Sequence, residues 1–404
     1  MPIAAVPSYL GSDFQYASPG MRFGMYLKLW EGPAWSKTKD RPLESAKRLN
    51  DSDKKTMQAL NLRQKQTFDA VAASGASLRL DALATAPFTT GLGNEHPLEN
   101  GFAFLNPYGL PYLPGSGVKG VLRQAARELA SGEWGDGHGW SEEKPYPLME
   151  DEGEKRRPVL GKSKQPVMLS MLDVLFGRES ATGDTSHVRG ALTFWDVIPQ
   201  IKGDSLVVEI MTPHQSHYYQ WKKDKHGNEI VVSPHESGQP NPISFLTVPP
   251  GSGFIFHVQC DLAHLSRIAP ELAANGTWKT LLTKAFEHAF DWLGFGAKTA
   301  VGYGAMERLS EEEIAGARRE AEAASLKCDW VDKTIDELVK KNNAKPGDTL
   351  RGKPLAEAWA ALTDVDVKKR ALGDIRSRWQ KEGWWDTPPS GTAKKVKGIY
   401  EGNG

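Results

Sequence analysis

Cysteine is nearly absent from this chain: Cys260 and Cys328 are the only two among 404 residues. Two cysteines cannot form a disulfide framework or a four-cysteine zinc site, and their scarcity is typical of a reducing compartment, so we expect a cytoplasmic protein. No run of about 18 apolar residues occurs, so no transmembrane helix is expected. The first residues, MPIAAVPSYLGSDF, lack the basic and apolar regions of a signal peptide.

The chain also has no net charge, because 50 Lys and Arg residues balance 50 Asp and Glu residues. Bulk positive charge therefore cannot hold it on a nucleic acid, and any such surface must be a local patch. An apolar fraction of 39% and a charged fraction of 25% are typical of a soluble globular protein with a core. The 13 tryptophans provide large rings for packing or for stacking.

The middle of the chain combines strand and helix patterns. Apolar residues alternate in the predicted strands and recur at helical spacing in the predicted helices. The strands are predicted at residues 77–86, 191–198, 205–211, 254–260 and 302–308, and the main helices at 117–130 and 277–293. Strand, helix, strands, helix, strand is the order of a ferredoxin-like or RRM-like α+β domain.

Three regions follow from these patterns. Residues 1–76 are predicted to be an N-terminal extension with peripheral helices, and residues 77–310 the α+β domain. Insertions at about 131–165 and 213–242 lack the periodicity of the rest of this domain. Residues 311–404 are charged and Trp-rich, and are predicted to be a helical C-terminal extension.

A basic stripe follows a glycine turn at the start of the first main helix. Gly115, Gly117 and Gly120 spell G-x-G-x-x-G, but the prolines before them do not suit the strand that a dinucleotide-binding motif needs. A helix N-terminus can still offer free N–H groups to a phosphate, with Ser116 as the expected N-cap. The stripe consists of Lys119, Arg123 and Arg127 at i, i+4 and i+8. It is either a phosphate-binding surface or an ordinary solvated helix face.

A second glycine-rich segment, GFGAKTAVGYG, covers residues 294–304. It is not a Walker A loop, because Ala297 and Trp292 stand where that motif has glycine. Its backbone amides and Lys298 could follow a phosphate chain. The alternative is a flexible turn that leads into a strand.

Basic and aromatic residues are interleaved in MTPHQSHYYQWKK, residues 211–223. Aromatic rings stack on unpaired bases and lysines neutralise phosphates, so this composition suits single-stranded RNA. An exposed hairpin with packed aromatics is the alternative. The residues concerned are His214, His217, Tyr218, Trp221, Lys222 and Lys223. The two histidines have no adjacent third ligand, so we expect neither a metal site nor a cofactor.

Several motifs together resemble the RAMP superfamily. They are GLGNEHPLENGFAFLNPYGLPYLPGSGVKGVLRQAAREL at residues 91–129, DVLFG at 173–177 and the glycine-rich segment at 294–304. With ALTFWDVIP, EIMTPHQSHYY and NPISFLTVPPG, the pattern is most similar to the family of the sixth subunit of the type III-B (Cmr) CRISPR effector complex. The resemblance covers about residues 77–308 and leaves both extensions unassigned.

The resemblance implies an RRM-like RAMP domain in an RNA-guided ribonucleoprotein of antiviral defence. Such a subunit caps the backbone filament, holds the 3′ part of the guide RNA and is not an enzyme. Its implied partners are guide (crRNA) and target RNA and the other RAMP subunits, especially the backbone subunit, with no membrane. Matched to the family motifs, the RNA-binding residues are Gly115, Ser116, Lys119, Arg123, Gly296, Lys298, Gly302 and Gly304.

Two other functions remain open. A RAMP-fold endoribonuclease that processes guide RNA without metal would need a histidine as acid or base, and His96 and His187 are the candidates. The second alternative is a scaffold that contacts only protein neighbours, although the basic stripe argues against it. The sequence has neither G-x-S-x-G nor H-E-x-x-H, so a non-catalytic protein is expected.

Overall fold

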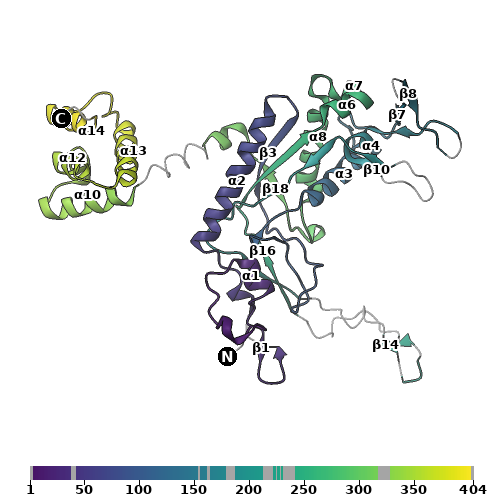
Figure 1. Ribbon diagram of the computed structural model, residues 1–404, viewed down its shortest axis with the longest axis horizontal. Coiled ribbons are helices and arrows are strands. Elements are labelled where there is room, and N and C mark those ends of the chain that lie inside the picture. Colours follow the sequence, from purple (N-terminus) through teal and green to yellow (C-terminus); the bar gives the residue numbers. More distant parts are fainter. Residues whose placement is uncertain are drawn as a thin grey trace. The chain divides into compact units, whose positions relative to one another are not determined.

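The computed structural model forms two compact units, Met1–Leu309 and Ser310–Gly404 (Figure 1). It describes residues 3–37, 42–152, 155–161, 164–178, 187–212, 222–223, 225–227, 229–230, 242–316 and 328–401. None of the helices in these ranges is long and apolar enough to cross a membrane.

A four-stranded antiparallel sheet forms the centre of the first unit. Its strands are β3 (Ser77–Ala84), β12 (Leu192–Phe194), β17 (Gly253–Cys260) and β18 (Met306–Arg308), in the spatial order β12-β17-β3-β18. Helix α3 (Gly115–Ser131) connects β3 to β12, and α8 (Thr277–His288) connects β17 to β18. The predicted ferredoxin-like α+β class is therefore confirmed.

The register between β3 and β17 fixes which side chains lie on each face of the sheet. Leu80 lies opposite Phe256, and both side chains are buried on the face covered by α3 and α8. The Phe256 ring packs 5.2 Å from Phe286 of α8 and 4.9 Å from Phe295, measured between centroids. Burial of each such side chain contributes about 1.5–3 kcal/mol, so this layer is the main core.

Helix α2 (Asp51–Ala72) packs against the opposite face of the sheet, alongside β3 (Figure 1). A capping box starts it, because the side chains of Asn50 and Asp53 each accept a hydrogen bond from the other's backbone N–H, both at 2.8 Å. Near its end, the Phe68 ring lies 4.5 Å from the His257 ring of β17. The sequence predicted only a peripheral layer here, whereas α2 covers the central strands.

His257 shows how closely α2 covers this face. The imidazole is 4% exposed, and neither ring nitrogen has a hydrogen-bond partner in the described ranges. Burial, aided by the charge of Arg79 opposite it, lowers the pKa of His257 to about 4. The ring is therefore neutral at pH 7 and packs as part of an aromatic cluster with Phe68 and Trp195.

Residues N-terminal to the sheet belong to the same compact unit. Phe23, Leu27, Leu29 and Leu43 are buried in the main core. The elements of this segment are η1 (Ser8–Leu10), α1 (Pro19–Gly24), β1 (Trp30–Glu31), β2 (Ser36–Lys37) and η2 (Pro42–Ser45). The boundary predicted at residue 76 is therefore not a boundary between compact units.

Short elements fill the connections between the sheet strands. Before α3 lie β4 (Phe104–Leu105) and β5 (Leu110–Pro111), and after it β6 (Tyr146–Pro147), β7 (Met149–Glu152), β8 (Lys155–Pro158), β9 (Met168–Leu169), α4 (Met171–Phe176), β10 (Gly177–Arg178) and β11 (Val188–Arg189). The predicted 213–242 insertion contains the antiparallel pair β14 (Lys222–Lys223) and β15 (Glu229–Ile230), flanked by the ribbon of β13 (Val207–Met211) and β16 (Ile243–Thr247). Helices α6 (Leu262–Ile268) and α7 (Pro270–Ala273) precede α8, and a π-helical turn, Ala289–Leu293, extends it.

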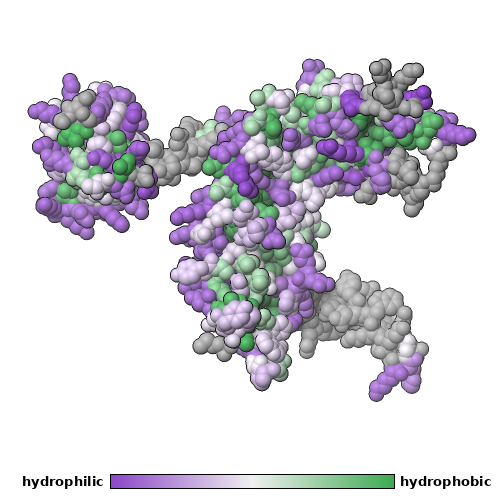
Figure 2. All heavy atoms as spheres, viewed as in Figure 1, coloured by the Kyte–Doolittle hydropathy of each residue, from purple (hydrophilic) through white to green (hydrophobic). Residues whose placement is uncertain are grey.

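The second unit has its own core and consists of helices. They are α10 (Asp329–Asn342), α11 (Pro346–Leu350), α12 (Lys353–Ala360), α13 (Val365–Lys381) and α14 (Gly391–Tyr400). Trp359, Trp379 and Trp385 are buried among them, so these tryptophans serve packing. On the face shown in Figure 2, hydrophilic side chains cover most of this unit.

The glycine-rich segment 294–304 connects α8 to β18 through its own backbone contacts. Phe295 N donates to Gly304 O at 2.9 Å, and Gly304 N donates to Pro87 O at 2.8 Å. A Cβ atom on Gly304 would lie 1.8 Å from Phe295 O, while one on Gly302 would meet no atom within 4 Å. Both glycines have positive φ, +72° and +92° respectively. Gly304 is therefore required by internal packing as well as by its backbone conformation.

We expect Gly304→Ala to destabilise the first unit by about 1–3 kcal/mol more than Gly302→Ala. Both variants suffer the positive φ, so their difference isolates the clash with the Phe295 carbonyl. Urea unfolding of the two variants beside the wild-type chain measures it. Equal losses of stability would show that the segment moves aside without strain.

We expect Asp374→Ala to destabilise the C-terminal unit by about 3–5 kcal/mol. The carboxylate is 2% exposed and accepts hydrogen bonds from Cys328 N at 2.7 Å and from two nitrogens of Arg378 at 2.7 and 2.9 Å. Its removal takes the acceptor from Cys328 N and from Arg378 Nε, and leaves Arg378 Nη2 with Asp332 alone. The control is Asp332→Ala, which removes the exposed partner of Arg378 and should cost less than about 1 kcal/mol. Thermal unfolding that ranks the two variants the other way would contradict the assignment.

Candidate nucleic-acid interface

A basic pocket of about 240 Å³ lies between α3, the end of α4 and the edge strand of the sheet. Four cationic side chains line it: Lys119, Arg123, Arg178 and Arg189. The remaining lining residues are Phe176, Gly177, Val188, Gly190, Leu192 and Thr193, so no carboxylate from the described ranges contributes to its wall. Such a pocket attracts a phosphate group.

Two of these cations come from α3. Lys119 and Arg123 are one helical turn apart and half-buried, while the opposite side of the helix enters the core through Val118, Leu122 and Ala125. The Arg123 Nε is buried, and within the described ranges it has no hydrogen-bond partner. A buried donor of a charged group gains from an anionic acceptor such as a phosphate oxygen.

The other two cations come from a short antiparallel ribbon. Gly177 ends α4 with φ +88° and begins β10, so Arg178 follows directly, and Gly177 pairs with Arg189 of β11. A Cβ on Gly190 would lie 2.4 Å from the Phe176 carbonyl carbon, so this ribbon requires glycine there. Arg189 Nη2 lies 3.8 Å from Asp261 Oδ2, an exposed pair that holds the guanidinium only weakly.

The sequence identified half of this pocket. Lys119 and Arg123 were predicted, and the structure brings them together. Arg127, the third residue of the stripe, does not line the pocket; it is exposed and its Nη1 donates to Gln124 Oε1 at 3.3 Å. Arg178 and Arg189 were missed. Arg178 directly follows the DVLFG motif, which was a usable signal, whereas only strand pairing reveals Arg189.

The N-terminus of α3 differs from the prediction. Helix α3 begins at Gly115 with Pro114 as N-cap, so Ser116 lies inside the first turn and is not the cap. Gly115 N donates to Asp196 Oδ1 at 2.7 Å, and a Cβ on Gly115 would lie 2.2 Å from Phe194 O. The expectation of a free N–H at Gly115 is therefore wrong, because a carboxylate already binds it. That negative charge disfavours a phosphate at the same point.

The second predicted site, the glycine-rich segment, is not part of the basic pocket. Lys298 Nζ lies 5.4 Å from the centroid of the Phe245 ring and 3.2 Å from Met211 Sδ, so its head group packs on β13 and β16. A Cβ on Gly296 would lie 2.3 Å from Thr89 O. Together with Gly304, this glycine is explained by protein packing. Gly302 is exposed, and a Cβ on it would meet no atom within 4 Å, although its N–H donates to Thr299 O at 2.9 Å.

The third predicted site is the insertion around β14. His214, His217, Tyr218 and Trp221 lie outside the described residues. Lys222 and Lys223 form β14, where they pair with Ile230 and Glu229 of β15. No group of three His, Cys, Asp or Glu residues suited to a metal ion occurs in the ranges that are described.

The two histidines considered for a nuclease do not line the basic pocket. His96 Nδ1 accepts from Leu98 N at 3.2 Å, and its Nε2 lies 3.1 Å from Phe23 O, so both ring nitrogens are engaged. Burial lowers the pKa of His96 below its ordinary value. His187 is exposed and precedes β11.

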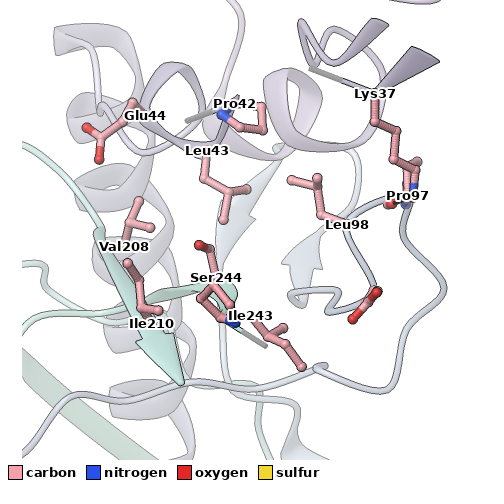
Figure 3. Close-up of a pocket in the computed structure, with 12 residues that line it drawn as sticks. Lys37, Pro42, Leu43, Glu44, Pro97, Leu98, Val208, Ile210, Ile243 and Ser244 are labelled. Carbon is pink, nitrogen blue, oxygen red and sulfur yellow. Dashed lines mark hydrogen bonds between the residues drawn. The ribbon is translucent and has the colours of Figure 1, made fainter. Parts of the chain in front are cut away.

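A larger, apolar pocket of about 340 Å³ lies elsewhere on the first unit (Figure 3). Leu43, Leu98, Val208 and Ile243 point into it from η2, the loop at 97–99, β13 and β16 (Figure 3). Among its described lining residues Lys37, whose Nζ donates to Pro97 O, is the one cation, and two glutamates, Glu44 and Glu99, also line it. Such walls do not suit a phosphate, so the basic pocket is the better candidate for RNA.

Comparison with known proteins points to the same region. A family model of the RAMP superfamily matches residues 82–307, which is more than half of the chain. A known protein to which the chain is similar is the CRISPR system Cmr subunit Cmr6 of Pyrococcus furiosus, with 29% identity over 243 residues. That alignment covers 53% of this chain and 63% of the relative, so the chain spans less than two thirds of the relative's length.

Two solved structures are also similar. One is a chain of the type III-B Cmr-beta complex bound to cognate target RNA, with 18% identity and a TM-score of 0.36, covering 61% of this chain and 65% of that one. The other is Cmr6 of Pyrococcus furiosus, with 25% identity and a TM-score of 0.29, covering 58% and 98%.

The predicted resemblance to RAMP proteins, and among them to Cmr6, is confirmed by these matches. The family match includes α3 and α8, which cover one face of the sheet, and every residue that lines the basic pocket. Because it extends over more than half of the sequence, the chain belongs to the RAMP superfamily.

Proposed function

We propose that this chain is a non-catalytic RNA-binding subunit of a type III-B CRISPR effector complex. In this role it caps the filament of backbone subunits in antiviral defence, and its basic pocket holds the 3′ part of the guide RNA. Membership in the RAMP superfamily and the similarity to a Cmr subunit support the assignment to such a complex. The observation that carries the RNA-binding role is the basic pocket.

The chemistry of the pocket suits the backbone of a strand better than its bases. Four cations converge on it, and Arg and Lys bind phosphates of any sequence, while the described lining residues include no Asn, Gln or carboxylate that would add contacts to a base edge. A guide-holding subunit must accept guides of any sequence, so contacts to phosphate alone are what this role requires. The formal net charge of zero agrees with this guide-holding role, because only one strip of the surface needs to be basic.

The sheet itself is not available for this purpose. RRM domains stack bases on aromatic residues of the open sheet face. In this chain α2 covers that face, and Phe68 and His257 are 5% and 4% exposed. We therefore place the RNA at the edge of the sheet, where the basic pocket lies, rather than on either sheet face.

A non-catalytic role is supported by what lines the pocket. A metal-independent nuclease needs an acid or base within hydrogen-bond reach of the scissile phosphate. Among the described residues of its wall there is no histidine, aspartate or glutamate, and His96 is engaged at both nitrogens elsewhere.

We expect Lys119→Ala with Arg123→Ala to weaken binding of single-stranded RNA equally for all sequences. The slope of log K against log salt should fall by about 0.7 for each lost phosphate contact, or about 1.4 for the pair. Filter binding at several salt concentrations measures both effects, and Arg178→Ala with Arg189→Ala should act in the same way. The matched control is Lys55→Ala with Arg63→Ala, which removes two exposed cations of α2. An unchanged slope in the pocket variants would mean that the pocket does not bind RNA.

We expect the purified full chain not to cleave repeat RNA or a guide–target duplex, with or without divalent metal. Gel analysis of end-labelled RNA measures this, with a metal-independent ribonuclease as the positive control. Specific cleavage that disappears in His96→Ala or His187→Ala would instead identify a guide-processing endoribonuclease.

A further inference from the structure

Two exposed tryptophans lie side by side at the ends of α3 and α8. Trp134 follows α3, and Trp292 belongs to the π-helical turn after α8. Their ring centroids are 5.2 Å apart, and the residues are 46% and 66% exposed. Tryptophan is the residue type most enriched among the energetically dominant positions of protein interfaces, so an exposed pair indicates a binding surface.

A buried polar contact holds this pair in place. Trp134 stands edge-on to the His288 ring at 5.0 Å between centroids. His288 Nε2 lies 2.7 Å from Glu128 Oε2, and the two side chains are 6% and 19% exposed. The imidazole is therefore fixed by α3, and the indole of Trp134 rests on a rigid support. A preorganised aromatic surface loses little entropy when a partner binds.

The two short segments that carry the rings are acidic, and the nearby cations Lys284 and Arg308 both pair with Glu287. Residues 128–136 and 288–292, which carry the pair, include Glu128, Glu133, Asp136 and Asp291 and contain no Lys or Arg. Glu133 and Asp291 are exposed, and the Asp136 side chain is 80% exposed. Carboxylates at this density repel RNA phosphates and attract cations, and indole faces bind Arg and Lys through cation–π contacts.

We propose that Trp134 and Trp292 form a docking site for a protein segment that carries an arginine or lysine with apolar residues beside it. The cationic head lies on an indole face with a carboxylate within reach, and the apolar residues cover the second ring. This inference rests on the proposed function only in its choice of partner, which is a neighbouring subunit of the effector complex. The surface is separate from the basic pocket, because neither tryptophan lines that pocket.

The experiment uses the full chain and the purified RAMP subunits of the same type III-B complex. Biolayer interferometry measures the Kd of the wild-type chain and of Trp134→Ala with Trp292→Ala for each subunit. We expect the double variant to weaken binding of one subunit at least about tenfold, as expected for interface tryptophans. The matched control is Trp35→Ala, which removes a tryptophan that is 52% exposed elsewhere in the unit and should leave every Kd unchanged.

A second variant, Glu133→Gln with Asp291→Asn, keeps both rings and removes two charges. We expect it to weaken the same interaction several-fold at low salt and to reduce its salt dependence. RNA affinity, measured in parallel, should remain at the wild-type level in both variants, which also shows that the unit is folded.

Three results would overturn the proposal. The first is that the wild-type chain binds a subunit and both variants bind every subunit with the same affinity as the wild-type chain. This result would reject the docking site and leave the proposed function intact. The second is loss of RNA affinity in the folded tryptophan variant, which would make the pair an RNA-stacking surface. The third is failure of the wild-type chain to bind any RAMP subunit, which would reject the effector-subunit function together with this partner.

Discussion

The pairing of β3 with β17 is the constraint on which the first unit depends. Its register, from Gly253 opposite Leu83 to Gln259 opposite Ser77, decides which side chains face the helices. A shift by one residue would place Leu80 and Phe256 on different faces of the sheet, and would bring either Arg79 or His257 into the main core. Two buried helices and the aromatic cluster around Phe256 fit only one of these alternatives.

With this register, the other face of the sheet also carries large side chains, which have to be buried as well. Helix α2 covers this face, on the side away from α3 and α8, and Phe68 packs there against His257. A sheet covered on both sides cannot stack bases, which is why the proposed RNA site lies at its edge. There, α3 and the β10–β11 ribbon place their cations around one pocket.

Charge is distributed in a way that net composition conceals. Equal numbers of acidic and basic residues give a neutral chain. Yet every charged residue among the described lining of the basic pocket is a cation, whereas residues 128–136 and 288–292 contain carboxylates and no Lys or Arg. Neutrality is therefore the sum of surfaces with opposite character. Such a chain can hold an anionic strand at one place and a cationic protein segment at another, as the proposed role between RNA and protein neighbours requires.

The sequence by itself determined the fold class and part of the site. Periodicity located β3, β17, α3 and α8. The buried residues of an amphipathic strand recur at every second position, and those of an amphipathic helix recur three to four positions apart. The spacing of Lys119 and Arg123 predicted a shared helix face for the same reason. The position of α2 was not predicted, since its thin apolar face does not specify which surface it covers.

Tertiary structure decided everything that depends on contacts between distant segments. Asp196 binds the N–H of Gly115 from 81 residues away, and Gly304 is required because the Phe295 carbonyl lies where its Cβ would be. Arg189 reaches the pocket only through pairing of β11 with β10, and Trp134 meets Trp292 only because their two helices pack together. Local sequence patterns do not predict such long-range contacts, because they depend on how the whole backbone folds and brings distant residues together.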